Sequence, residues 1–218
     1  VRDANGVERL RGVNFVARGG EIVGIAAVEG NGQHELLRLL AGRLRPTRGN
    51  AATPDVVGFI PEDRRRDALI GSFSLVENVA LLGAGRRRGI ERWNEHRETT
   101  EHVISDYDVR SAGPDTRASA LSGGNQQKLV VGRELEGSYA AIVAENPSRG
   151  LDVQASAAIT ARLREARDAG MAVVVYSSDL DEVLELADRV VVLYAGRLTD
   201  VANDRDAVGR AMLGASAE

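Results

Sequence analysis

The chain of 218 residues contains no cysteine and a single lysine, Lys128. The absence of cysteine excludes disulfide scaffolds, thiol nucleophiles and cysteine-ligated metal sites. Aromatic residues make up only 4% of the chain, and no apolar run approaches the ~20 residues that are needed to span a bilayer. No signal peptide opens the sequence, so we expect a soluble protein whose default compartment is the cytoplasm.

An excess of positive charge is also lacking. The chain carries 32 acidic and 28 basic residues, with a formal net charge of -4, which argues against a nucleic-acid binder that relies on a broad basic surface. Hydrophobic residues reach 43% and charged residues 28%, so a packed core is possible and the composition argues against wholesale disorder. The first residues, from Val1, already have strand and turn character, which suggests a segment of a longer polypeptide.

Several short apolar runs, rich in valine, isoleucine and alanine, predict β-strands at 22–28, 56–60, 140–144, 172–176 and 190–194. The runs do not alternate with polar residues, so each strand is expected to be buried on both faces, as in a parallel sheet flanked by helices. Helical patterns occupy 33–40, 153–169 and 204–213, and a further helix follows Ser178, where Asp181 completes a capping box. We therefore predict an α/β fold.

The stretch 64–136 differs from the rest because it has no convincing buried strand. It has helical patterns at 74–82 and 92–106. We predict a single domain, in which 1–63 and 137–218 form an α/β core and 64–136 form an inserted helical lobe. The arginine runs 64–66 and 86–88 lie in this lobe, either as solvated loops, as a coupling surface toward a membrane subunit or as a nucleic-acid patch.

The first chemical feature is the turn after the first predicted strand. Gly30, Asn31 and Gly32 lead into Gln33, His34 and Glu35 at the start of an apolar helix. Strand, glycine loop and helix together form the geometry of a phosphate-binding loop, where backbone N–H groups face an anion. A working loop also needs lysine at position 33 and a hydroxyl at position 34, which holds Mg²⁺. Both are missing, so an ordinary turn is an equally good interpretation of this segment alone.

The second feature is the octet LSGGNQQK at 121–128, which opens a helix. Ser122 can cap that helix, and Gly123 and Gly124 allow backbone amides to approach a phosphate closely. The octet resembles the signature motif of ATP-binding-cassette proteins, with the glutamine-rich extension, including Gln126, that is typical of sugar and nucleoside importers.

The rest of the chain resembles this family from end to end, and in particular the second cassette of importers that fuse two cassettes in one polypeptide. Glu62 lies in IPEDR, at the loop where the family normally carries a glutamine. Glu145 and Asn146 match the end of the Walker B strand, Asp152 matches the D-loop and Ser178 matches the switch region. The resemblance implies a RecA-like P-loop NTPase core with an inserted α-helical subdomain that carries the signature motif.

The chain departs from the family pattern at the positions used for hydrolysis. Glu145 replaces an aspartate, and Asn146 replaces the glutamate that activates water, although an amide cannot act as a general base near neutral pH. Ser178 replaces the switch histidine. Because phosphoryl transfer depends on positioning and charge stabilisation, these changes and the altered loop predict that the domain has no catalytic residue of its own and does not hydrolyse ATP through its own loop.

The resemblance implies a head-to-tail pair of cassettes. This chain would donate its signature to the ATP of a partner cassette, sharing Mg-ATP, while its own site is silent or empty. We expect no metal site, a first nucleotide-binding domain in the same polypeptide, permease subunits as further partners, no nucleic acid, and a location at the inner face of the membrane through the permease. The transported substrate is a nucleoside or a simple sugar, with GNGQ and NPSRGLD favouring a nucleoside.

Three alternatives stay open: an active ATPase with an atypical loop, a cassette serving translation or DNA repair, and a structural module that never meets nucleotide. The candidate nucleotide-binding residues are Gly30, Asn31, Gly32, Gln33, His34, Glu35, Glu62, Ser122, Gly123, Gly124, Gln126, Glu145, Asn146, Asp152 and Ser178.

Overall fold

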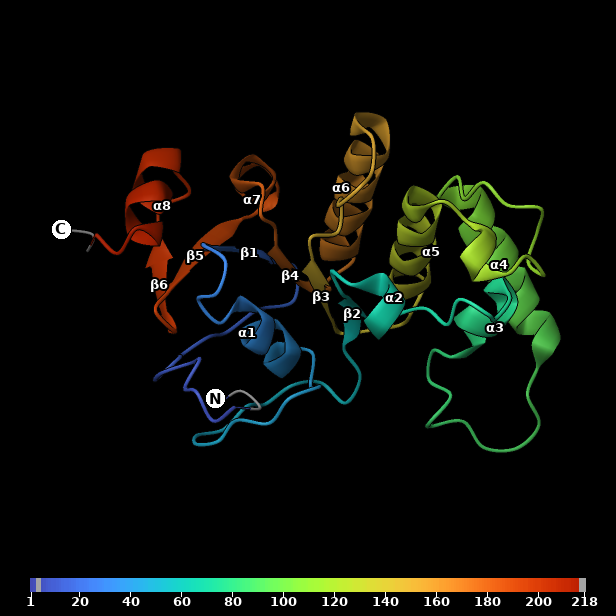
Figure 1. The fold of residues 1–218 in the computed structure, drawn as a ribbon, viewed down its shortest axis with the longest axis horizontal. Coiled ribbons are helices and arrows are strands. Elements are labelled where there is room, and N and C mark those ends of the chain that lie inside the picture. Colours follow the sequence, from blue (N-terminus) through green and yellow to red (C-terminus); the bar gives the residue numbers. More distant parts are fainter. Residues whose placement is uncertain (3–4, 216–218) are drawn as a thin grey trace. The chain divides into compact units, whose positions relative to one another are not determined.

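The computed structural model describes residues 1–2 and 5–215. The chain divides into two compact units (Figure 1): unit 1 comprises Val1–Phe59, Tyr139–Asn146 and Thr160–Glu218, and unit 2 comprises Ile60–Ser138 and Pro147–Ile159. Unit 2 contains the stretch 64–136 and also Pro147–Ile159, which we had assigned to the α/β core. None of the helices in the described ranges is both long enough and apolar enough to cross a membrane.

The structure contains a six-stranded sheet in the order β2-β3-β4-β1-β5-β6. Strand β1 is parallel to β4 and β5, and β3 is parallel to β4, whereas β6 is antiparallel to β5. The five predicted strands are confirmed, but the sheet is mixed rather than wholly parallel. The strands are β1 (Ile22–Ala27), β2 (Gly58–Ile60), β3 (Ala141–Glu145), β4 (Ala172–Tyr176), β5 (Arg189–Tyr194) and β6 (Arg197–Val201).

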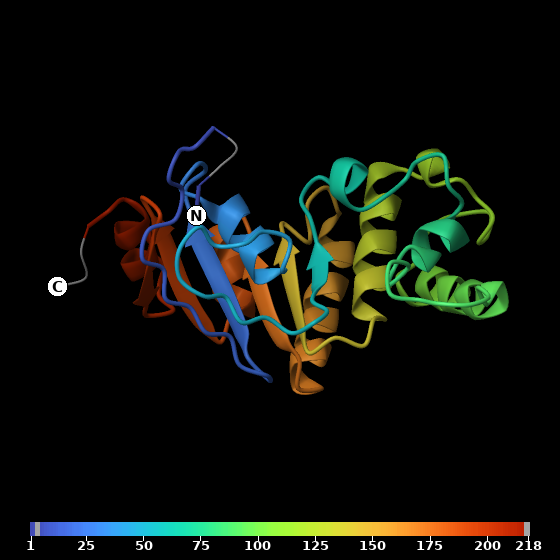
Figure 2. The same cartoon turned by 90° about the horizontal axis from the view of Figure 1, so that it is seen from below.

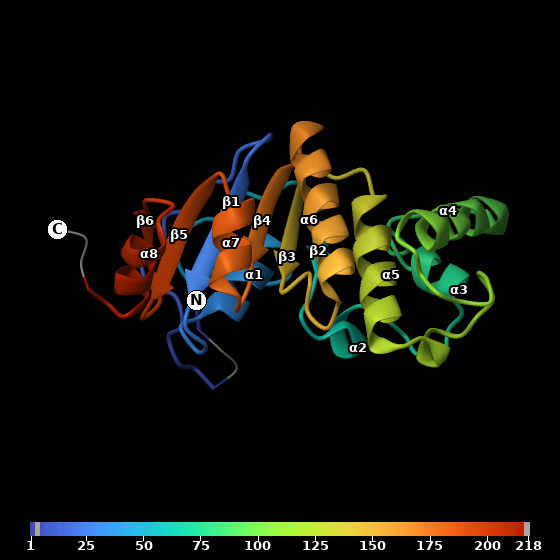
Figure 3. The ribbon, with the colours of Figure 1, turned by 90° about the horizontal axis from the view of Figure 1, so that it is seen from above.

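Helices cover both faces of the sheet in unit 1. Helix α1 (Gln33–Leu40) lies over one face, as Figure 2 shows, and α7 (Leu180–Leu186) and α8 (Arg205–Met212) lie over the other, as Figure 3 shows. Consecutive residues of β1 and β5 point to opposite faces of the sheet. Ile25 therefore packs in the hydrophobic cluster that includes residues of α1, and Ala26 packs in the cluster that includes residues of α7 and α8. Burial on both faces explains why the strands have continuous apolar sequences.

A glycine in β1 allows α7 to approach the sheet closely. A Cβ atom at Gly24 would lie 2.7 Å from both the Val183 and Ala187 side chains. The N-cap of α7 corrects our prediction, because Asp179 rather than Ser178 caps the helix. The Asp179 carboxylate accepts a hydrogen bond from the N–H of Asp181, since a carboxylate at the N-cap satisfies an otherwise unpaired donor.

Unit 2 is helical and has a buried arginine at its centre. Its Arg133 side chain donates to the backbone oxygens of Ala68 and Asn78 and pairs with Glu134 at 2.9 Å. These bonds tie the loop before α3 and the end of α3 to α5, because a buried guanidinium must find acceptors. The helices are α2 (Arg64–Asp67), α3 (Leu75–Ala80), α4 (Trp93–Asp106), the 3-10 helix η1 (Ala118–Ala120), α5 (Gly123–Leu135) and the first part of α6 (Val153–Asp168).

Candidate functional site

The loop between β1 and α1 has the backbone of an anion-binding turn. Gly30 and Gly32 have φ values of +88° and +101°, and a Cβ atom at Gly32 would lie 2.6 Å from the carbonyl oxygen of Arg9, so that only glycine fits there. Asn31 holds the turn, since its amide donates to the Val28 oxygen at 2.8 Å and its oxygen accepts from the N–H of Ala195 at 2.7 Å.

The first turn of α1 leaves its backbone donors unused. No side chain caps Gly32, and among residues 1–2 and 5–215 no acceptor meets the N–H groups of Gln33, His34 and Glu35. Such groups at a helix N-terminus favour a negative charge. The backbone of the loop therefore fits a phosphate.

The side chains of the loop do not supply the charge that a phosphate needs. Gln33, at the position that the resemblance assigns to the family lysine, is fully buried, and its amide faces the side chain of Tyr176. A neutral amide cannot replace the ammonium group of lysine. Glu35, in the same turn, adds a negative charge to the helix end.

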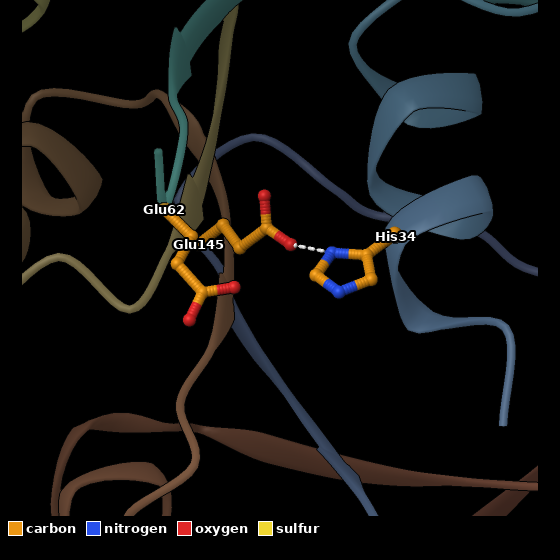
Figure 4. Close-up of side chains that lie close together, drawn as sticks. All are labelled: His34, Glu62 and Glu145. Carbon is orange, nitrogen blue, oxygen red and sulfur yellow. Dashed lines mark hydrogen bonds and ion pairs between the residues drawn. The ribbon is translucent and has the colours of Figure 1, made fainter. Parts of the chain in front are cut away.

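His34 is held by a carboxylate from the neighbouring strand. Its Nδ1 atom is hydrogen-bonded to Oε1 of the buried Glu145 at the end of β3 (Figure 4), and its Nε2 atom lies 3.5 Å from Oε1 of the exposed Glu29. The hydrogen bond that His34 donates to the Glu145 carboxylate is the main cause that raises the pKa of His34 above its usual 6.5, although burial opposes it. His34 and Glu145 thus form an ion pair when His34 is protonated.

This pair determines whether the loop can bind Mg²⁺. In P-loop NTPases the ion is held by the hydroxyl that follows the lysine and by the Walker B aspartate. Mg²⁺ prefers oxygen ligands in near-octahedral geometry. At the position that the resemblance assigns to the hydroxyl, the imidazole of His34 is hydrogen-bonded to the Glu145 carboxylate. An imidazole nitrogen is a poor ligand for Mg²⁺, so His34 does not fit Mg²⁺ in the place of the hydroxyl.

The residue that the resemblance assigns to the position of the water-activating glutamate, Asn146, has a structural role. Asn146 is buried and has a φ of +47°, a conformation that asparagine tolerates better than most residues. Its N–H donates to the Tyr176 oxygen at 2.7 Å, and its side-chain oxygen accepts from the N–H of Ser178 at 2.8 Å. The side chain of Asn146 fixes the backbone of the switch region, and Asn146 and Ser178 provide no general base.

Unit 2 places two of the predicted residues in structural roles. Glu62 forms an ion pair with Arg149, which lies in the NPSRGLD segment. Asp152 accepts a hydrogen bond from the N–H of Ala155 at 2.8 Å and so caps the start of α6. Both contacts lie within this unit.

The signature octet forms the N-terminus of α5, as predicted. The Ser122 hydroxyl accepts from the N–H of Asn125 at 3.4 Å, and the N–H groups of Gly123 and Gly124 have no acceptor among the described residues. These two donors and the dipole of a 13-residue helix favour an anion at this point.

The glutamines of the octet fix its surroundings. Gln126 donates to the Ala118 oxygen at 2.9 Å, and Gln127 donates to the Pro147 oxygen at 2.8 Å. Gln126 also accepts a 3.4 Å hydrogen bond from Arg64. Sequence reasoning named Arg64 only within a motif and an arginine run, and it gave Gln127 no role.

The fold matches that of solved ATP-binding cassettes. The chain superposes on a dimeric post-hydrolysis ATP-binding cassette, MJ0796 bound to ADP and Pi, with a TM-score of 0.78 and 24% identity over 90% of this chain and 91% of the other. A structure described as the ATP-binding subunit of an ABC transporter gives a TM-score of 0.76 with 20% identity, covering 94% and 87% of the two chains. The chain has the fold of an ATP-binding cassette.

Curated relatives are closer in sequence. The cassette is 35% identical to the guanosine import ATP-binding protein NupO of Bacillus subtilis, over 94% of this chain and 44% of NupO. It is 35% identical to the nucleoside import ATP-binding protein NupA of Lactococcus lactis, over 92% and 43%. It is 37% identical to the glucose import ATP-binding protein TsgD13 of Haloferax volcanii, over 97% and 43%. The cassette thus spans less than half the length of these relatives. No protein-family model matches the chain.

Proposed function

We propose that the chain is the degenerate, second-type nucleotide-binding domain of an importer for nucleosides or simple sugars. In this function the cassette pairs head to tail with a partner cassette and with permease subunits, at the inner face of the membrane. It donates Ser122, Gly123 and Gly124 to the ATP held by the partner. Its own loop forms a second, silent half-site, so hydrolysis depends on the partner.

One contrast carries this proposal. The signature is complete and presents two unpartnered N–H groups at the start of α5, whereas the cassette's own loop has a neutral Gln33 and a His34–Glu145 pair where charge and metal are needed. A site that lacks its lysine, its hydroxyl and its water-activating carboxylate loses most of the electrostatic stabilisation of phosphoryl transfer.

The relatives support the class of transported substrate. Two of the three described above are named for guanosine or nucleoside import and one for glucose import. The GNGQ and NPSRGLD segments of this chain also favour nucleosides. We therefore place nucleosides before simple sugars, and stimulation of ATPase activity by nucleosides in the assembled transporter tests this order.

The deciding experiment compares two variants in the assembled transporter. Gly123→Asp places a carboxylate where the terminal phosphate would lie, and like-charge repulsion should abolish ATP hydrolysis. The variant should still fold, because aspartate is favourable in the first turn of a helix and the added Cβ meets only the flexible end of Arg64. His34→Ala, in the cassette's own loop, should leave turnover within about twofold. Turnover that survives Gly123→Asp and disappears in His34→Ala would reverse the assignment and favour an active ATPase with an atypical loop.

A further inference from the structure

An arginine outside the octet lies directly on the signature motif. Arg64 is the first residue of α2, and a Cβ atom at Gly123 would lie 2.7 Å from its Nη2 atom. Its Nε atom donates to Oε1 of Gln126 at 3.4 Å. The guanidinium group thus lies beside the first residue of α5, and both residues belong to unit 2.

The charge of Arg64 is not neutralised by an acidic partner. The side chain forms no ion pair with any aspartate or glutamate in the described ranges 1–2 and 5–215. The nearest acid in sequence, Asp63, uses its carboxylate to accept the backbone N–H groups of Arg65 and Arg66 and so caps α2. Burial is the main cause that lowers the pKa of Arg64, and the charge of Arg65 contributes in the same direction, whereas the charge of Asp63 opposes both.

The position of this cation is electrostatically unfavourable within the cassette itself. The N-terminus of α5 carries a partial positive charge on the N–H groups of Gly123 and Gly124. A partly buried guanidinium beside it adds a second positive charge in the same place, at a cost in desolvation. An anion bound between the two would remove this repulsion, because a guanidinium can donate two hydrogen bonds to one phosphate group.

We propose that Arg64 binds the terminal phosphate of the nucleotide together with the signature motif. This inference rests on the proposed function, in which that nucleotide is held by the partner cassette. Arg64 supplies the positive charge that the signature itself lacks, and it acts on the partner's ATP rather than in the cassette's own loop.

Gln126 is the positioning residue for Arg64. Its Nε2 atom donates to the Ala118 oxygen at 2.9 Å, which fixes the orientation of the amide and turns Oε1 toward Arg64. The glutamine-rich extension of the octet thereby has a physical role, since it holds the arginine against the signature glycine.

The test measures ATPase activity of the assembled transporter carrying Arg64→Ala, Arg64→Lys or the control Arg65→Ala. Loss of a charge-assisted bidentate contact predicts a roughly 100-fold drop in kcat for Arg64→Ala. Arg64→Lys keeps the positive charge but cannot donate two parallel hydrogen bonds to one phosphate group, so its kcat should fall about tenfold. The exposed Arg65 is the neighbouring residue of the same helix, and its removal should change kcat less than twofold. Inhibition by orthovanadate, an analogue of the transferred phosphate, should need about tenfold more inhibitor in Arg64→Ala.

A double-mutant cycle separates positioning from a general structural effect. Gln126→Leu should lower kcat in the wild-type background. It should have less than a twofold effect when Arg64 is already alanine, because Gln126 acts only by positioning Arg64. Additive effects would overturn the positioning role. Should Arg64→Ala fail to fold, Arg64→Lys carries the test, and wild-type turnover in that variant contradicts the inference.

The outcomes also distinguish this inference from the proposed function. If Gly123→Asp abolishes turnover while every Arg64 variant retains it, the signature is donated without help from Arg64 and only the inference fails. If Gly123→Asp and Arg64→Ala both retain turnover, signature donation itself is wrong.

Discussion

The His34–Glu145 pair should make the stability of this cassette depend on pH in a defined direction. Hydrogen bonds to charged groups contribute about 1.5–3 kcal/mol. Because 41% of the His34 side chain is exposed, solvent screening reduces this to about 1 kcal/mol. In a chain of this length, that free energy corresponds to a change of about 2–4 °C in Tm.

The sign follows from the raised pKa of His34 in the folded state. The folded cassette binds the proton more tightly than the unfolded chain does, so stability decreases with rising pH. The contribution of the pair is fully present below the unfolded pKa of about 6.5 and is lost as the pH rises through the higher, folded value. Urea denaturation between pH 5.5 and 9 should therefore show that the wild type loses more stability than His34→Gln over this window.

A matched variant and a direct titration complete the assay. His102→Gln removes an exposed histidine of α4 and should retain the pH dependence of the wild type. An NMR titration should place the pKa of His34 above 6.5, and Glu145→Gln should lower it, because the hydrogen bond to the Glu145 carboxylate is the main cause of the shift. A His34 pKa at or below 6.5, or equal pH slopes in the wild type and His34→Gln, would refute the reasoning.

Three further substitutions test local features of the fold by urea denaturation. Gly24→Ala should cost about 1–3 kcal/mol, because the new methyl group would overlap the side chains of α7. Ser122→Ala should cost about 1 kcal/mol through loss of the N-cap of α5, and Ser122→Asp should restore it. Asn146→Ala should cost about 1–3 kcal/mol, since it removes the hydrogen bond to Ser178 and places alanine at a φ of +47°, whereas Asn146→Gly should be tolerated better. Equal stability of Asn146→Ala and the wild type would contradict this account of the switch region.

The sequence alone predicted the strands that are buried on both faces, because such burial requires a continuous apolar sequence. Strands β1, β3, β4 and β5 are buried on both faces, so their apolar runs were recognisable, whereas β6 is an antiparallel edge strand with the mixed sequence RLTDV and escaped notice. The cap of α7 was misassigned because Ser178 and Asp179 are adjacent and both are good caps. Local sequence patterns cannot choose between two neighbouring caps without the backbone geometry.

For the candidate site, the sequence predicted individual residues but not the contacts between them. Motif order located Gln33, His34, Glu145 and the signature glycines, because each lies in a contiguous segment. The bond between His34 and Glu145 joins residues 111 positions apart, and that between Arg64 and Gln126 joins residues 62 positions apart. Such contacts depend on strand order and helix packing, which residue spacing along one chain does not specify.

The two departures from the family pattern that form the pair are physically coupled. Glutamate is one methylene longer than the aspartate that the resemblance implies at this position, and Glu145 at the end of β3 contacts the imidazole of His34. Changing either residue alone would disrupt the pair and leave its partner with less stabilisation in a partly buried setting. Together they neutralise each other when His34 is protonated. In the function that we propose, the exchange at position 34 removes the hydroxyl that would hold Mg²⁺ in the cassette's own loop, while the signature at the start of α5 stays available to a partner.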